Sequence, residues 1–225
     1  METARLFKKQ RACVNVKEQI DKIENGVYTV LNPLGFCKHG RTLHRFVSGN
    51  ISQLIHFQCG QSYRNETHLM WVNIGIRVPE CMEHSFELQN QKMYYTEVAC
   101  NMRTRLGAVR HRDSRRMTTY DLRKDTGKLV KEIVGEIMQD VIPVFNLLSS
   151  RESILSHRRE YPWFDTLNSH LILLEESMMY GYMGDIKKAK KLFEEYYGEA
   201  RQANRNPSHI AYLDQLAVKL GLQCQ

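Results

Sequence analysis

Long apolar stretches are missing from this sequence of 225 residues. No window approaches the roughly 18 consecutive apolar residues that a membrane-spanning helix needs. The first 24 residues carry several basic side chains but no apolar segment of the kind that a secretory signal requires. The composition therefore predicts a soluble, cytoplasmic protein with no membrane partner.

Sequence motifs of known enzyme classes are also missing. The chain has no Gly-x-Ser-x-Gly element, no glycine-rich phosphate loop and no His-Glu-x-x-His. His111-Arg112-Asp113 is the tripeptide of a kinase catalytic loop, but Thr118 stands where that loop needs Asn, and no Asp-Phe-Gly follows. We therefore predict no catalytic residue and no cofactor, and we favour a non-catalytic role over that of an enzyme.

Cysteine is sparse, and the six residues are scattered, so we expect reduced thiols rather than a disulfide framework. Four side chains have the spacing of zinc-ligand pairs: His56 with Cys59, and Cys81 with His84. Residues three apart on a strand point to opposite faces, however, so the first pair can reach one ion only across a tight turn at Gly60. A zinc site and a plain strand histidine beside a half-buried thiol both remain open, and we favour the second.

What the chain does have is an ordinary core composition with an uneven distribution of charge. Apolar residues make up 42% and charged residues 25%, which predicts a packed core in one domain or two small ones. Residues 1–120 hold 18 basic and 10 acidic side chains, a net charge of +8, and the remainder is close to neutral. Six arginines lie within residues 103–116: Arg103, Arg105, Arg110, Arg112, Arg115 and Arg116. This run is either a solvated loop, which we favour, or a surface for nucleic-acid phosphates.

The first half reads as one helix followed by an antiparallel sheet. An apolar stripe recurs at helical spacing through Val16, Ile20, Ile23, Val27 and Val30. Pro33 should end that helix at Asn32. Short stretches rich in aromatic and β-branched residues predict strands over 36–47, 51–59, 69–78 and 94–102. Alternation along residues 69–76 gives one apolar face and one mixed face, so only one face of the sheet must belong to the core.

From residue 125 onward the pattern is helical. Pro143 should kink or end the first of these helices, and Ser149 with Glu152 resembles a capping box for the next. Helices are predicted over 170–182 and 184–204, with a last one opened by Asn206-Pro207 and closed at Gly221. The predicted fold is therefore α+β: residues 1–124 form a helix on an antiparallel sheet of about four strands, and residues 125–225 form a helical subdomain packed on it.

Four segments together resemble a bacterial family catalogued as domain of unknown function 4304. They are Leu-Asn-Pro-Leu-Gly-Phe-Cys-Lys-His-Gly-Arg-Thr-Leu-His-Arg at 31–45, Ile-His-Phe-Gln at 55–58, Val-Asn-Ile-Gly-Ile at 72–76 and Asn-Met-Arg-Thr-Arg-Leu-Gly at 101–107. The resemblance covers about residues 15–110, and Leu43 departs from it where an aromatic residue is more usual. It implies a fold and no activity.

Polar side chains on otherwise apolar strands form the candidate site. Arg45, Gln58, Asn73 and Arg105 come from four successive predicted elements, and a meander can bring them to one face beside Trp71 and Arg103. They either satisfy neighbouring backbone groups, which we favour, or form a pocket in which guanidinium groups bind a carboxylate or phosphate. The leading functional hypothesis is a non-catalytic binding or interaction protein that recognises a protein or an acidic ligand. Nucleic-acid association and an unrecognised hydrolase are the alternatives.

Overall fold

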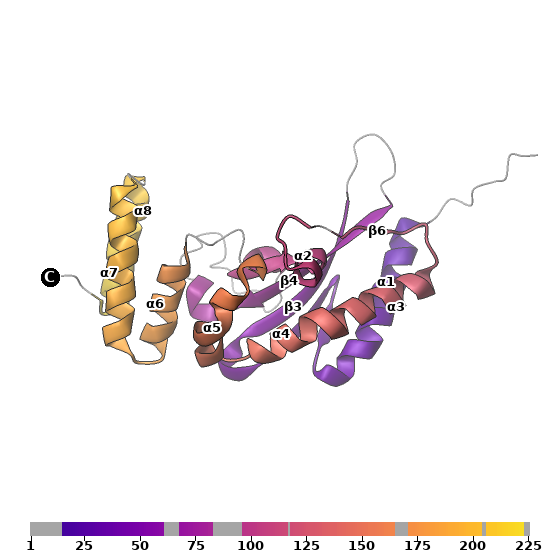
Figure 1. Ribbon diagram of the computed structural model, residues 1–225, viewed down its shortest axis with the longest axis horizontal. Helices are drawn as coiled ribbons and strands as arrows, with labels where there is room; N and C mark the ends of the chain where they lie inside the picture. The colour runs from indigo at the N-terminus through magenta and orange to yellow at the C-terminus, as the bar shows by residue number, and fades with distance from the viewer. Residues whose placement is uncertain are drawn as a thin grey trace, which may run out of the picture.

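The computed structural model describes residues 15–60, 68–82, 96–116, 118–164, 171–203 and 206–222. Its architecture is α+β, as predicted: an N-terminal helix, an antiparallel sheet and a helical second half (Figure 1). The strands are β1 (Cys37–His39), β2 (Thr42–Phe46), β3 (Ser52–Cys59), β4 (Leu69–Arg77), β5 (Met102–Arg105) and β6 (Tyr120–Asp121). The helices are α1 (Val16–Leu31), α2 (Leu106–His111), α3 (Thr126–Glu136), α4 (Ile142–Leu147), α5 (Arg151–His157), α6 (Ile172–Tyr182), α7 (Ile186–Gln202) and α8 (Pro207–Lys219).

Helix α1 forms for the reasons that its sequence indicates. The side chain of Asn15 accepts a hydrogen bond from the backbone N–H of Glu18 at 3.2 Å and so caps the first turn. Its apolar stripe, with Ile23 and Val27 fully buried, faces the core, but Val30, predicted as the last member of the stripe, is exposed. The helix ends at Leu31, one residue before the predicted end at Asn32. Asn32 itself keeps helical dihedrals (φ −56°, ψ −43°), and the chain continues into a 3₁₀ turn over Asn32–Leu34 that ends at Gly35, where φ is 88°.

The sheet is an antiparallel meander in the order β1-β2-β3-β4-β5, and β6 pairs with the start of β4. Two strand predictions need correction. The single strand expected over 36–47 is a hairpin, because Gly40 adopts a left-handed φ of 55° that turns the chain between β1 and β2.

The strand expected over 94–102 instead begins at Met102, and residues 94 and 95 lie outside the described part. Residues 97–99 form a 3₁₀ turn, η5 (Glu97–Ala99), which lies against β3 and β4. The arginine run that follows is not one solvated loop. It begins within β5 and continues through α2.

One face of the sheet belongs to the main core. Ile55 on β3 and Ile74 on β4 are fully buried and join one hydrophobic cluster with Ile23 of α1 and Ile133 of α3. Helices α1 and α3 contact each other and run side by side (Figure 1). This arrangement leaves the opposite face of the sheet to other neighbours.

The helical half differs from its prediction in two local details. The helix that contains Pro143 widens into one π turn (Ile137–Val141) before α4 begins, because proline has no N–H to continue the regular bonding. The cap of α5 is Ser150 rather than Ser149, since the Ser150 hydroxyl accepts from the N–H of Ser153 at 3.2 Å. The predicted caps at Asn206 and Gly221 are confirmed.

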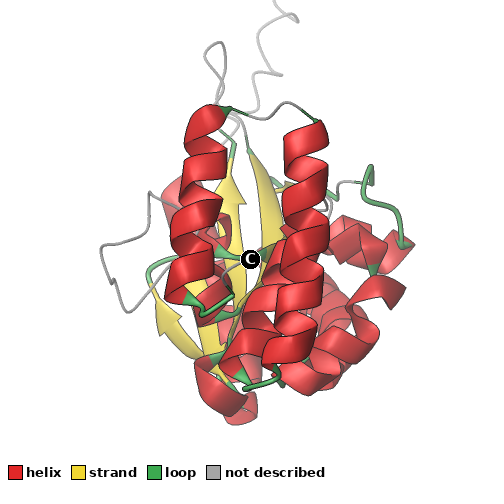
Figure 2. Cartoon of the chain, turned by 90° about the vertical axis from the view of Figure 1, so that its left-hand side faces the viewer, coloured by secondary structure: helices red, strands yellow, loops and turns green. Residues whose placement is uncertain are grey.

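The last three helices extend the molecule away from α1 and α3. Figure 1 shows α7 and α8 at the end of the molecule that carries the C-terminus, and Figure 2 views the molecule from that end, with strands visible behind the helices. Buried side chains of α7 and α8, including Phe193 and Leu213, belong to the same hydrophobic cluster as the sheet. The division at residues 124 and 125 into two units stays a prediction. In the described ranges, no helix combines the length and the apolar character needed to cross a membrane.

Candidate binding face of the sheet

The sheet face opposite α1 and α3, here called the polar face, carries a continuous row of polar side chains across four strands. Thr42 on β2 lies opposite His56 on β3, His56 lies opposite Asn73 on β4, and Asn73 lies opposite Arg105 on β5. Directly opposed residues in an antiparallel sheet share a face. Gln58 opposes Trp71 in the next row on one side, and Gly75 opposes Arg103 in the next row on the other.

The turn η5 places a carboxylate on this row. Glu97 accepts a hydrogen bond from Asn73 Nδ2 through Oε1 at 2.7 Å, and its Oε2 lies 3.7 Å from His56 Nε2. Asn73 Nδ2 also donates to Gln58 Oε1 at 2.9 Å. Thr42 Oγ1 and His56 Nδ1 are 2.9 Å apart, which completes a chain of polar contacts from β2 to η5.

The surroundings keep both histidines of this face neutral. Burial lowers the pKa of His56, with the Glu97 carboxylate opposing that shift. His44, which is 1% exposed, has its pKa lowered to about 4 by burial, helped by the nearby His39 and His56. A neutral His56 can accept from the Thr42 hydroxyl at Nδ1, whereas its Nε2 is too far from Glu97 Oε2 for a hydrogen bond.

A hydroxyl, an imidazole and a carboxylate in series are also the groups of a nucleophile with its base. Thr42, however, is only 4% exposed, and its hydroxyl is engaged with His56. A substrate carbonyl therefore has no approach to Thr42 Oγ1 in this arrangement. The series positions η5 on the sheet rather than exposing a reactive group.

The outer part of the polar face is cationic and aromatic. The guanidinium carbon of Arg105 lies 5.6 Å from the centre of the Trp71 ring, within the range of a cation–π contact. Trp71 and both arginines of β5 are partly exposed, and Gln58 is exposed. Trp71 Nε1 and Arg103 Nε are buried atoms without a hydrogen-bond acceptor in the described part of the chain. Glu97 Oε2, an acceptor on the same face, is likewise a buried atom without a hydrogen-bond partner in the described chain.

Five of the six predicted site residues therefore share one face, namely Gln58, Trp71, Asn73, Arg103 and Arg105. Arg45 does not join them, because it lies one residue out of phase with Thr42 and His44 on β2. It packs on the core side, where its Nη2 donates to Gln53 Oε1 at 2.6 Å and to Asn146 Oδ1 at 3.0 Å. Its guanidinium also lies over the ring of Phe36.

The proposed zinc ligands do not meet where the structure describes them. His56 lies on the polar face, and Cys59 belongs to the other face, where its Sγ accepts a hydrogen bond from Arg41 Nη1 at 3.0 Å. Cys81 is completely buried, and burial raises the pKa of its thiol. His84 lies outside the described residues. The described part of the chain contains no group of three or more potential ligands placed to hold a metal ion.

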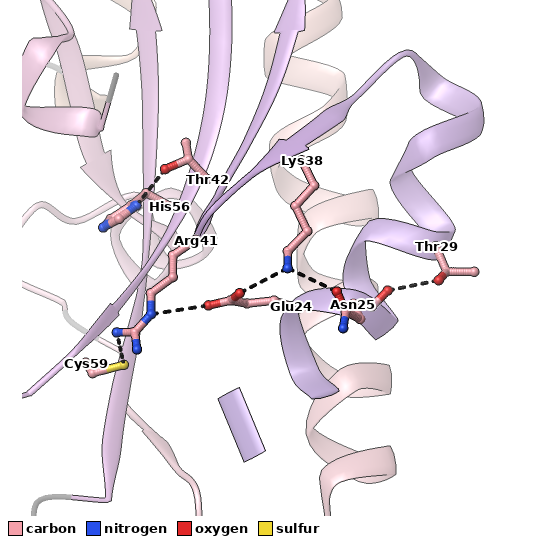
Figure 3. Close-up of polar contacts among 8 residues, drawn as sticks. All are labelled: Glu24, Asn25, Thr29, Lys38, Arg41, Thr42, His56 and Cys59. Atoms are coloured by element: carbon pink, nitrogen blue, oxygen red, sulfur yellow. Dashed lines mark hydrogen bonds and ion pairs between the residues drawn. The ribbon is translucent and has the colours of Figure 1, made fainter. Parts of the chain in front are cut away.

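A second polar cluster, on the core side, was not anticipated from the sequence. Figure 3 shows the carboxylate of Glu24, on α1, between Lys38 and Arg41 of the β1–β2 hairpin. Lys38 Nζ is 3.3 Å from Oε2, and Arg41 Nε is 3.7 Å from Oε1. Burial raises the pKa of Glu24, and the two cations oppose that shift. The cluster joins α1 to the hairpin, and Arg41 links it through Cys59 to β3.

Sequence reasoning also missed three members of the polar face, namely Thr42, His44 and Glu97. Thr42 and His44 could have been paired from the sequence, because strand alternation places both side chains on the same face of β2. Glu97 had none, because its role depends on a turn that crosses the sheet.

The family model described as "Domain of unknown function (DUF4304)" matches residues 27–147. This range contains the six strands that the structure describes, the turn η5 and helices α2 to α4. It confirms the family resemblance and carries it beyond residue 110 into the helical half. No curated protein and no solved structure matches the chain.

Proposed function

We propose, from the premise that the chain belongs to the DUF4304 family of domains of unknown function, that it is a non-catalytic binding protein. Its polar face recognises acidic groups, either on a small ligand or on a partner protein. The proposal includes a cytosolic location, which the four described cysteines support as free thiols.

The observation that carries the proposal is the cationic and aromatic part of the polar face, where Arg105 lies over the Trp71 ring and Arg103 occupies the same face of β5. Both arginines are partly exposed. An occupant with carboxylate or phosphate oxygens would pair with their guanidinium groups. Guanidinium groups favour such oxygens because their planar donors match them in pairs.

The inner part of the face supports a binding role over a catalytic one. Glu97, the acidic side chain of the network, is 15% exposed and already bonded to Asn73. Thr42 is buried behind His56. The inner groups therefore hold one another in place, while the accessible groups of the face are donors and an aromatic ring.

Trp71 provides a direct reporter for the test. The sequence has two tryptophans, so Trp163→Phe leaves Trp71 as the sole indole. In that background, titration with a hexaglutamate peptide should change the fluorescence, because a bound carboxylate draws Arg105 from the Trp71 ring. Inorganic phosphate, titrated separately, tests the small-anion form of the proposal.

Arg105→Ala should weaken hexaglutamate or phosphate binding by about tenfold, which corresponds to about 1.4 kcal/mol. The matched control is Arg123→Ala, which removes the same charge from an exposed pair with Asp121 on β6. Equal affinities of the two variants, or the absence of any fluorescence change with both probes, would refute the proposal.

Nucleic-acid association is the second candidate, because residues 1–120 carry a net charge of +8. Two arginines of the run are already paired with carboxylates, Arg110 with Glu136 and Arg115 with Asp113, which leaves fewer charges for phosphates. Filter binding of single- and double-stranded nucleic acid at about 50 mM salt tests it, since phosphate contacts are strongest at low salt. No retention under that condition rules it out.

A further inference from the structure

A cavity of about 460 Å³ lies away from the polar face, between α2, the π turn, α4 and the segment that contains Tyr161 and Trp163. Its volume is within the range of small-molecule sites. Val144 and Leu147 of α4 contribute apolar walls. Tyr161 and Trp163 contribute an aromatic pair in edge-to-face contact, with ring centres 5.3 Å apart. This part of the wall therefore suits an apolar, preferably aromatic, group, while Arg110, Arg112, Gln139 and Asp140 make the rest of the wall polar.

The cavity also carries one available charge of each sign. Arg110 is one of its lining cations, but Glu136 already neutralises it. The side chains of Arg112 and Asp140 line the cavity too, and within the described ranges neither has a hydrogen-bond or ion-pair partner. A purely anionic ligand would meet Asp140, and a purely cationic one would meet Arg112. An occupant with both charges suits both side chains.

The backbone at Arg112 is a second, independent observation. Arg112 ends α2 in the left-handed region, with φ 50° and ψ 34°, where glycine is the usual residue. A long side chain at such a position is conformationally unfavourable, and strain of this kind concentrates at functional sites. The side chain of this exposed residue lines the cavity.

Trp163 contributes its ring to the cavity wall, but its Nε1 is a buried atom that is not accessible from the cavity. A ligand carboxylate therefore pairs with the guanidinium of Arg112.

We infer that this cavity is a binding site for a zwitterionic amino acid with an aromatic side chain. The carboxylate pairs with Arg112, the ammonium group pairs with Asp140, and the side chain packs against Val144, Leu147 and the aromatic pair. The inference is independent of the polar face, because none of these residues belongs to it.

L-Phenylalanine is the probe, and calorimetric titration of the full chain at up to about 10 mM ligand is the measurement. Arg112→Gly should weaken binding at least about tenfold while leaving the thermal midpoint equal or higher, because glycine favours the left-handed cap. The control is Arg115→Ala, which removes a charge from the same run at a side chain that is 89% exposed and pairs with Asp113. No binding to the wild type, or equal binding by Arg112→Gly, overturns the inference.

Two analogues test the double-charge requirement. 3-Phenylpropanoate lacks the ammonium group and 2-phenylethylamine lacks the carboxylate, so each should bind the wild type at least about tenfold more weakly than L-phenylalanine. Asp140→Asn should weaken L-phenylalanine and leave or improve the binding of 3-phenylpropanoate. If 3-phenylpropanoate binds the wild type as well as L-phenylalanine does, the site takes a simple carboxylate and the inference is wrong.

Discussion

His44 illustrates how much one buried side chain can make this protein depend on pH. It sits in the middle of β2, is 1% exposed, and has a pKa lowered to about 4 from its ordinary 6.5. Burial is the main cause, because the charged imidazole loses its hydration. In the unfolded chain the imidazole of His44 is hydrated again, so it binds a proton at a higher pH than it does in the folded protein.

The folded state should therefore lose stability as the pH falls from about 6.5 to about 4, since the unfolded state binds more protons in that window. The contribution of His44 is about 2–3 kcal/mol between pH 7 and pH 4.5. Urea unfolding of the wild type and of His44→Gln at both pH values measures it.

The variant should show a smaller loss between the two pH values than the wild type. Some loss should remain in the variant, because it retains His56, whose lowered pKa also makes the folded state less stable at low pH. The matched control is His157→Gln, at a partly exposed histidine that pairs with Glu160. Identical pH dependence of the wild type and His44→Gln would contradict the assignment.

Gly75 of β4 and Gly135 of α3 have opposite roles. The chain that leads from η5 into β5 passes closely over Gly75, where a methyl group would come within 2.6 Å of Cys100 Sγ. Gly135 lies on the exposed side of α3, and a methyl group there would contact nothing within 4 Å beyond the helix itself. The first glycine permits a close approach, and the second only weakens a helix.

Gly75→Ala should destabilise the protein by about 1–3 kcal/mol, because the added methyl group must displace Cys100 or Leu54. Gly135→Ala should stabilise it by about 0.5–1 kcal/mol through helix propensity. Urea midpoints at pH 7 compare the two substitutions, which make the same chemical change. A neutral result at Gly75 would show that η5 does not pack on β4 as described.

Connections across the chain, finally, join the sheet to the C-terminal helices. Arg158, which follows α5, pairs with Glu175 of α6 at 2.5 Å, and both side chains are completely buried. The backbone carbonyl of Glu175 accepts from Cys81 Sγ at 3.5 Å, close to the end of β4. This ion pair therefore sits where the sheet, the middle helices and the C-terminal helices meet.

Glu175→Gln should cost about 3–5 kcal/mol, because it leaves the Arg158 charge buried without its counterion. The double variant Arg158→Met/Glu175→Leu should recover most of that loss, since it removes both charges and keeps an apolar filling. Urea unfolding of the wild type, the single variant and the double variant measures the difference. A double variant as unstable as the single one would show that other contacts of these residues carry the effect.

The sequence predicted the elements whose signals are local. The stripe and cap of α1, the opening of α8 at Asn206-Pro207 and the left-handed Gly221 depend on neighbours within about four residues. The misplaced fourth strand has a different cause. Residues 97–99 have strand-like composition, but Glu97 bonds to Asn73, 24 residues away, and that contact favours a turn over the sheet.

Residue patterning by itself determined the α+β class, the helical second half and the mixed character of one sheet face, because helical and strand periodicities are properties of short segments. Folding determined which polar side chains meet. Strand register put Arg45 on the core side, where it reaches Asn146 across 101 residues, and put Arg105 over Trp71. Such contacts follow from how strands and turns pack together, which no local pattern specifies.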